Sequence, residues 1–177
     1  MHKVTVATLL PFFLALTLIP AWADPAPAPS NRLTDRQTEL IQIIQDARDE
    51  ALKTHSYKNA RMGMQIRIQN YYNKSHEFDD FQGKIVGTRV FPNNDVWIDI
   101  ELADGITVQT SPTIEDDPEH VTLLKGGTKL ADIAATLKSG DRVRFNATLV
   151  RFVNDKDEDM INASRMLAQF KTITPLK

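Results

Sequence analysis

The sequence contains no cysteine, which excludes disulfide bonds and any catalysis or metal binding by a thiolate. It also has little excess charge, because 21 lysine and arginine residues stand against 23 aspartate and glutamate residues. Proteins dedicated to nucleic acids usually carry a clear basic excess, so we expect no nucleic-acid partner. Glycine is scarce, with 7 residues in the chain, and Gly63 is the only one before residue 78. The chain therefore changes character near residue 78, from a helix-like segment to a region of short strands and turns.

The first 23 residues have the parts of a secretory signal peptide. A basic start with Lys3 precedes an apolar stretch at residues 4–19, and Ala21-Trp22-Ala23 supplies the small residues that signal peptidase accepts. The apolar stretch is short for a bilayer, which disfavours the alternative of an uncleaved anchor. We expect cleavage after Ala23 and a periplasmic or secreted protein that contacts the membrane only during export.

Residues 24–31 read DPAPAPSN, which predicts an extended linker ahead of a helical extension at residues 32–75. Thr34 and Gln37 form a capping box, and the helix that they begin should end near His55. Its apolar stripe has two interpretations, since it could pack on the following domain or dock on a partner protein. We favour packing. The residues that would dock are Leu40, Ile41, Ile44, Ala47 and Leu52, and the stripe also includes Ala51.

Residues 56–75 are ambiguous. Met62, Met64, Ile66 and Ile68 alternate with polar residues, as in a strand. Ser56 is nevertheless a good helix N-cap, and glutamine and arginine between the apolar residues favour a helix. We favour the helix, ending near Asn73.

From residue 78 apolar and polar residues alternate along the chain with a period of two, which predicts β-strands. The first spans residues 78–91, with Gly83 and Gly87 permitting a bend, and the second and third form a hairpin around Asp104-Gly105. Thr128 should cap a short helix, and the acidic turn at residues 154–159 should separate the fourth strand from the last. The expected later strands lie at residues 96–102, 106–110, 142–153 and finally at 160–164 and 167–174, with a break near Arg165-Met166.

Three strands, a helix and two strands is the element order of the OB-fold, a five-stranded barrel. We therefore predict a mainly β protein with a helical N-terminal extension, in which residues 78–177 form an OB-fold-like barrel with a helix between strands three and four. The start Phe81-Gln82-Gly83-Lys84-Ile85, the Asp104-Gly105 hairpin and residues 137–145, reading LKSGDRVRF, resemble exported bacterial OB-fold proteins of the tRNA_anti-like group. The resemblance implies a non-enzymatic binding or interaction module.

OB-folds usually bind ligands across strands two and three and the adjoining loops. The alternative for the aromatic residues of this region is packing beneath the N-terminal helices, which we favour for Phe91 and Trp97. An aromatic platform flanked by arginines would suit single-stranded nucleic acid, but the acidic loop at residues 155–159 would repel phosphates. The candidate ligand-binding residues are Arg89, Phe91, Trp97, Arg144, Arg151 and Phe152.

No catalytic or metal motif stands out, so we expect no enzyme activity, cofactor or metal. The acidic loops lack the glycine and distal glutamate of a calcium loop, and His55, His76 and His120 are isolated in the sequence. We therefore expect a module that binds a protein or peptide of the bacterial envelope, with a cation or sugar on the barrel face as the alternative. A nuclease-like hydrolase is a third hypothesis, and it would need Arg89, Asp99, Glu101, Asp104 and Arg144 to converge.

Overall fold

The computed structural model describes residues 33–111, 122–153 and 156–176. The predicted signal peptide, the linker at residues 24–31 and the acidic loop around His120 lie outside the described residues. Among the residues described, no helix has the length and apolar character needed to cross a membrane.

Two helices precede the barrel, as predicted. α1 spans Asp35–Thr54, and the hydroxyl of Thr34 accepts a hydrogen bond from the N–H of Gln37 at 3.1 Å. α2 spans Tyr57–Lys74, so the helical interpretation of this segment is confirmed. The alternation of apolar and polar residues does not indicate a strand here, because two of the apolar residues, Met62 and Ile66, are exposed to solvent. The buried face follows the helical period instead and consists of Ala60, Met64, Ile68 and Tyr71.

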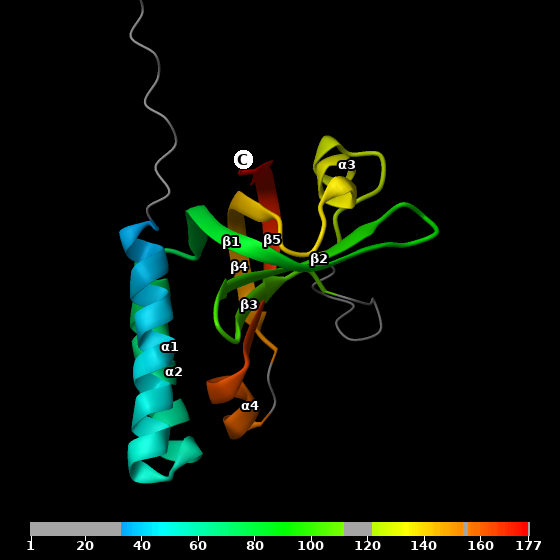
Figure 1. Ribbon diagram of the computed structural model, residues 1–177. Helices are drawn as coiled ribbons and strands as arrows, with labels where there is room; N and C mark the ends of the chain where they lie inside the picture. The colour runs from blue at the N-terminus through cyan, green and yellow to red at the C-terminus, as the bar shows by residue number, and fades with distance from the viewer. Residues whose placement is uncertain (1–32, 112–121, 154–155, 177) are drawn as a thin grey trace, which may run out of the picture. The chain divides into compact units, whose positions relative to one another are not determined.

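The strands close into an OB-like barrel in the order β1-β2-β3-β5-β4 (Figure 1). All neighbouring strands are antiparallel except β3 and β5, which are parallel. α3, at Lys129–Thr136, lies between β3 and β4 in the sequence. The fold is therefore mainly β with a helical extension, as predicted. The strands are β1 Glu77–Val90, β2 Val96–Ala103, β3 Ile106–Gln109, β4 Arg142–Phe152 and β5 Ser164–Pro175.

The prediction for the last strand is wrong in one part. Asp157–Asn162 forms a short helix, α4, rather than a half-strand, and β5 runs without the expected break. Met160 and Ile161 are buried, and α4 contacts both α1 and α2. A helical turn at this position buries Met160 and Ile161 against α1 and α2. This tertiary contact outweighs the local preference for a strand that the alternating sequence indicates.

Aromatic rings fill the centre of the barrel. Phe78 and Phe81 stack with their ring centroids 4.5 Å apart, and Phe145 lies between Phe81 and Phe170 at 6.1 and 5.3 Å. A shift in the β1–β4 register between Phe78 and Phe81 lets both rings enter the core although they are three residues apart. Burying each ring contributes about 2 kcal/mol.

Gly83 lets β1 lie close against β2. A Cβ atom at this position would sit 2.4 Å from Cγ2 of Ile100 and 2.7 Å from the carbonyl oxygen of Glu101. Gly83 was predicted to permit a bend, and the structure gives it another role, because the absence of a side chain allows two strands to approach closely.

Candidate functional site

The outward face of the β1–β2 hairpin gathers charged and aromatic side chains. Its cross-strand pairs are Lys84 with Glu101, Gly87 with Asp99, and Arg89 with Trp97. Alternation along β2 places the residues between them, Ile98 and Ile100, in the core with no exposed surface. We call the surface formed by these three outward pairs the β1–β2 face.

An aromatic and cationic cluster occupies one end of this face. The indole of Trp97 lies across Gly87, where a Cβ atom would sit 2.9 Å from the ring. The guanidinium of Arg89, directly opposite Trp97, lies 5.1 Å from the centre of the Phe91 ring, within range of a cation–π contact. The structure therefore brings together three of the predicted ligand-binding residues.

Trp97 and Phe91 do not take the position favoured from the sequence. Trp97 packs on Gly87 within the hairpin, and the backbone N–H of Phe91 bonds to the carbonyl of Asp95 at 2.9 Å. α1 meets β1 at Gln82, at the other end of the strand pair. The prediction that Trp97 packs beneath the N-terminal helices is therefore wrong, because the indole ring packs on the backbone of Gly87 instead.

A buried polar atom without a partner lies on this face. The indole Nε1 of Trp97 has no hydrogen-bond partner among the residues described. Burial raises the pKa of Asp99 above its ordinary value, although a hydrogen bond with Thr107 and the charge of Arg165 act in the opposite direction. Buried polar groups are normally satisfied, so the indole N–H marks a place where a ligand could supply the missing partner.

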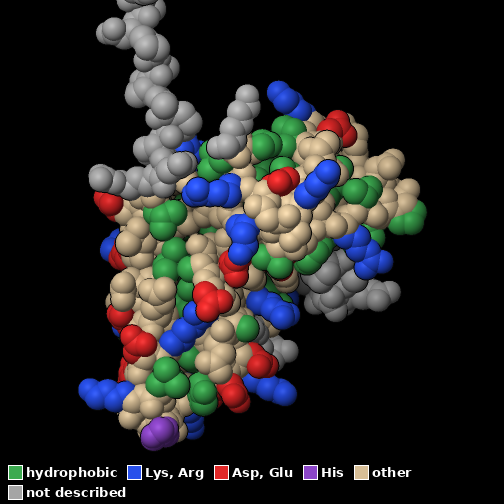
Figure 2. Space-filling model, in the orientation of Figure 1, with side chains coloured by type: hydrophobic (Ala, Val, Ile, Leu, Met, Phe, Trp, Pro, Cys, Tyr) green, Lys and Arg blue, Asp and Glu red, His purple; other side chains and the backbone are tan. Residues whose placement is uncertain are grey.

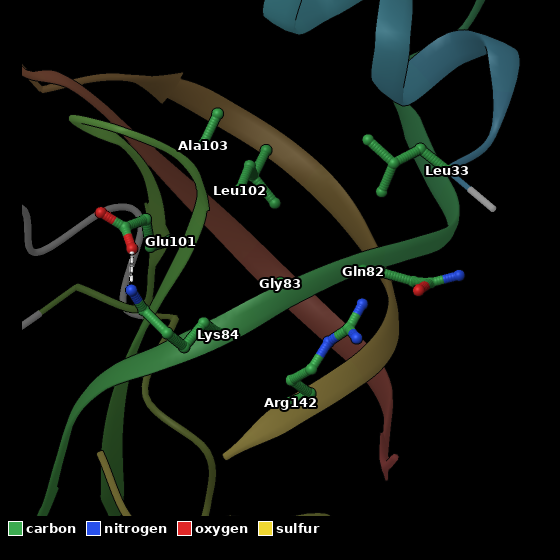
Figure 3. Close-up of a pocket in the computed structure, with 8 residues that line it drawn as sticks. All are labelled: Leu33, Gln82, Gly83, Lys84, Glu101, Leu102, Ala103 and Arg142. Atoms are coloured by element: carbon green, nitrogen blue, oxygen red, sulfur yellow. Dashed lines mark ion pairs between the residues drawn. The ribbon is translucent and has the colours of Figure 1, made fainter. Parts of the chain in front are cut away.

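A pocket of about 180 Å³ lies at the other end of the face (Figure 3). Leu33 approaches it from the start of α1, and Arg142 approaches it from the start of β4. Lys84 and Glu101 form an ion pair of 2.6 Å at its edge. Sequence reasoning did not select Leu33, Lys84 or Arg142 as site residues, because their convergence depends on the register of β1 with two different strands.

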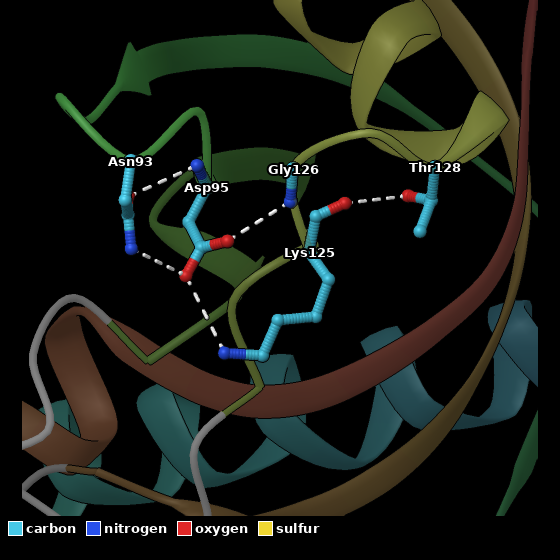
Figure 4. A network of polar contacts seen from close by, with 5 residues as sticks. All are labelled: Asn93, Asp95, Lys125, Gly126 and Thr128. Carbon is cyan, nitrogen blue, oxygen red and sulfur yellow. Dashed lines mark hydrogen bonds and ion pairs between the residues drawn. The ribbon is translucent and has the colours of Figure 1, made fainter.

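A polar network holds the turn that joins β1 to β2 (Figure 4). The carboxylate of Asp95 accepts hydrogen bonds from the N–H of Gly126 at 2.9 Å and from the side-chain amide of Asn93 at 3.0 Å. The ammonium of Lys125 lies 3.4 Å from the same carboxylate. The hydrogen bond from Gly126, together with Lys125, holds the pKa of Asp95 below its usual range. The network therefore ties the hairpin to the segment before α3 and holds the aromatic cluster in place.

The other predicted ligand-binding residues lie elsewhere. Arg144 pairs with Gln82 of β1 and Thr174 of β5, near the attachment of α1. Arg151 and Phe152 pair with Leu167 and Met166 of β5, at the far end of β4. The strand pairing therefore does not place them beside Trp97, since a closed barrel distributes β1 and β4 residues around its circumference.

The predicted docking stripe of α1 is largely inaccessible. Leu40, Ile44 and Ala47 are fully buried and Ile41 is 9 % exposed, whereas Leu52 is 68 % exposed. α1 packs on α2 and α4, so the stripe serves the fold of this chain. The docking interpretation is therefore wrong for these four residues. Leu52 is the exposed member of the five, and it does not pack with the others.

No metal-binding cluster forms among the residues described. They hold no group of three histidine, aspartate or glutamate side chains arranged to bind a metal ion. The nuclease-like constellation is not assembled, because Arg144 lies beside Gln82 while Arg89 lies opposite Trp97. Asp104 lies at the β2–β3 turn, where its carbonyl accepts a hydrogen bond from Arg48.

Comparison of this chain with protein-family models, with curated proteins and with solved structures found no match in any of the three.

Proposed function

We propose that this chain is an exported, non-enzymatic binding module that recognises a protein or peptide of the bacterial envelope through its β1–β2 face. The observation that carries the proposal is the convergence of Arg89, Phe91 and Trp97 at one end of that face. Tryptophan and arginine are enriched at the energetic centres of protein interfaces, where they combine apolar area with directed polar contacts.

Rigid support strengthens the proposal. The aromatic cluster lies on paired strands, and the Asp95 network anchors the adjoining turn to Gly126 and Lys125. A surface held in its binding conformation loses little conformational entropy on association, which favours affinity. The signal-peptide pattern of residues 1–23 and the resemblance of residues 137–145 to exported OB-fold proteins support the assignment to the envelope.

The charge pattern favours protein over nucleic acid as the partner. On the face seen in Figure 2, acidic and basic side chains are interspersed over the helices. On the β1–β2 face, Lys84 and Arg89 are accompanied by Asp99 and Glu101. Binding of a phosphate backbone relies on an uninterrupted basic surface, which this arrangement does not provide.

Pull-down from the native envelope with variants tests the proposal. The wild-type chain should capture one dominant partner, and Arg89→Ala combined with Phe91→Ala should lose it. Lys53→Ala is the control, because this exposed lysine lies in the last turn of α1, outside the β1–β2 face, and the variant should retain the partner. Equal recovery by the double variant and the control would refute the proposal.

A sugar is the second candidate ligand, and the unpartnered indole N–H of Trp97, on the same face of β2 as the carboxylate of Asp99, favours it. An indole ring and a carboxylate can together offer an apolar surface and a hydrogen-bond acceptor to a hydroxylated ligand. Thermal unfolding in the presence of an oligosaccharide panel distinguishes the two candidates, since a bound ligand raises the melting temperature. A shift that Asp99→Asn abolishes would favour the sugar over the protein partner.

A further inference from the structure

One edge of β5 is only partly paired. The parallel ladder with β3 ends where Gln109 meets Leu167, whereas β5 continues to Pro175. From Ala168 onward, β4 is the one ladder partner of β5 among the strands that the structure describes. The free edge of a strand presents backbone N–H and C=O groups that can pair with another chain.

Two hollows lie along this edge beside α3. A hollow of about 350 Å³ lies between α3 and the last part of β5, and a second of about 360 Å³ lies between the segment before α3 and Gln169. Leu130 lines both hollows, and we call them together the α3–β5 groove. Its apolar lining consists of Leu123, Leu124, Leu130, Ile133, Phe170 and Ile173.

The opposite wall of the groove also has strand character. The N–H and C=O of Leu124 both bond to Val96 of β2, at 3.0 and 2.9 Å. In an antiparallel bridge the adjacent residue directs its own N–H and C=O to the other side. The backbone N–H and C=O of Leu123 therefore point away from β2, and Leu123 lines the groove. An extended segment bound in the groove would have the backbone of β5 on one side and the backbone of Leu123 on the other.

Lysines are the charged side chains among the described residues that line the groove. They are Lys125, Lys129 and Lys171, and none of the described residues that line either hollow is an aspartate or glutamate. Lys125 is paired with Asp95 and Lys171 with Glu77. Lys129 has no ion-pair partner among the residues described and is exposed at the start of α3. An occupant with carboxylates would complement this lysine while its backbone pairs with β5.

We propose that the α3–β5 groove binds an extended acidic peptide segment of a partner protein, which adds as a strand to the free edge of β5. This mode takes affinity from backbone hydrogen bonds and specificity from alternate side chains. Apolar side chains of the segment would contact Leu130 and Ile133, and its carboxylates would face Lys129. The groove is separate from the β1–β2 face, so this inference does not depend on the function proposed for that face.

Fluorescence anisotropy with a synthetic probe tests the inference on the full chain. The probe is a fluorescein-labelled peptide of alternating glutamate and valine, matched in length to β5 beyond Leu167. Lys129→Glu should weaken binding by about tenfold, because it replaces an attraction by a repulsion. Lys138→Glu is the matched control, since this exposed lysine lies outside the groove, and it should bind like the wild type. Thr172→Glu, a second exposed position that lines the groove, should also weaken binding.

Two further probes separate strand addition from simple charge attraction. Methylating alternate backbone amides of the peptide gives two isomers, and only the one whose methyl groups face β5 should lose binding. A peptide with lysine in place of glutamate should not bind. Arg89→Ala with Phe91→Ala should leave binding of the acidic peptide unchanged, which separates this groove from the β1–β2 face. Absence of binding to the wild-type chain, or equal binding by Lys129→Glu and Lys138→Glu, would overturn the inference and leave the lysines as protectors of a bare edge.

Discussion

Gln37 of α1 bonds both backbone groups of Gln82 in β1. Its side-chain amide donates to the carbonyl of Gln82 at 2.6 Å and accepts from the N–H of Gln82 at 2.8 Å. Gln37 is fully buried and Gln82 is 3 % exposed. A single side chain thus supplies the donor and the acceptor that a neighbouring strand would otherwise provide, and it attaches the helical extension to the barrel.

Replacing Gln37 by leucine should destabilise the protein by about 2–4 kcal/mol, because a buried N–H and a buried C=O of Gln82 lose their partners. Urea unfolding measures this loss. Gln42→Leu is the matched control, since Gln42 lies exposed on the same helix and bonds only to Asp46 in the hydrogen bonds described. A loss no larger than that of the control would contradict the structural role of Gln37.

Arg48 joins α1 to the β2–β3 turn and to α4. Its guanidinium donates to the carbonyls of Asp104 at 2.6 Å, Gly105 at 3.0 Å and Ile161 at 2.8 Å. Burial lowers the pKa of Arg48, and the charge of Asp104 opposes that effect. Arg48→Lys should cost about 1–3 kcal/mol, because an ammonium cannot reproduce the planar fork of donors. Lys53→Arg, an exposed change in the same helix, should be neutral in the same denaturation assay.

Gly83→Ala should destabilise the barrel by about 1–3 kcal/mol, since the added methyl group would overlap Ile100 and the backbone of Glu101. Gly63→Ala provides a contrast with the same chemical change. Gly63 lies in α2, where the nearest atom to a new Cβ is 3.6 Å away, so alanine should stabilise by about 0.5–1 kcal/mol. Thermal unfolding of both variants gives the comparison, and effects of the same sign would contradict the packing described.

Asp95 should make stability depend on pH. Its pKa in the folded protein lies below the ordinary value of about 4, so the carboxylate contributes stability above that value. This contribution should disappear as the pH falls through the lowered folded pKa. Asp95→Asn should therefore reduce the melting temperature at neutral pH, and the difference from the wild type should shrink as the pH falls below the ordinary pKa of an aspartate. A difference that stays constant over this range would contradict the role of the charge.

Local patterns in the sequence predicted most of the elements but not how they meet. Alternation from Val96 to Leu102 identified the core face of β2, and Thr34 marked the start of α1. The reciprocal bonds of Gln37 with Gln82 could not be predicted, because they join residues 45 positions apart. The same limit explains the error at Met160, whose burial beside the helices depends on contacts far along the chain.

The candidate site was predicted in part for similar reasons. Arg89 and Trp97 were selected as exposed positions on the strands and loops that bind ligands in OB-folds, and the structure pairs them across β1 and β2. Arg151 and Phe152 were misplaced, since their position depends on how the barrel closes through β5. The α1 stripe was correctly recognised as apolar, but its periodicity could not distinguish an internal surface from an external one.

Fluorescence of Trp97 tests the central claim most directly. The chain contains two tryptophans, and Trp22 lies in the predicted signal peptide, so Trp97 is the single tryptophan reporter in protein that begins at Asp24. Titration with the partner recovered from the envelope should shift the Trp97 emission to shorter wavelength and reduce its quenching by iodide, because the indole becomes covered. Binding of that partner with unchanged emission and unchanged quenching would contradict the assignment of the β1–β2 face as the recognition surface.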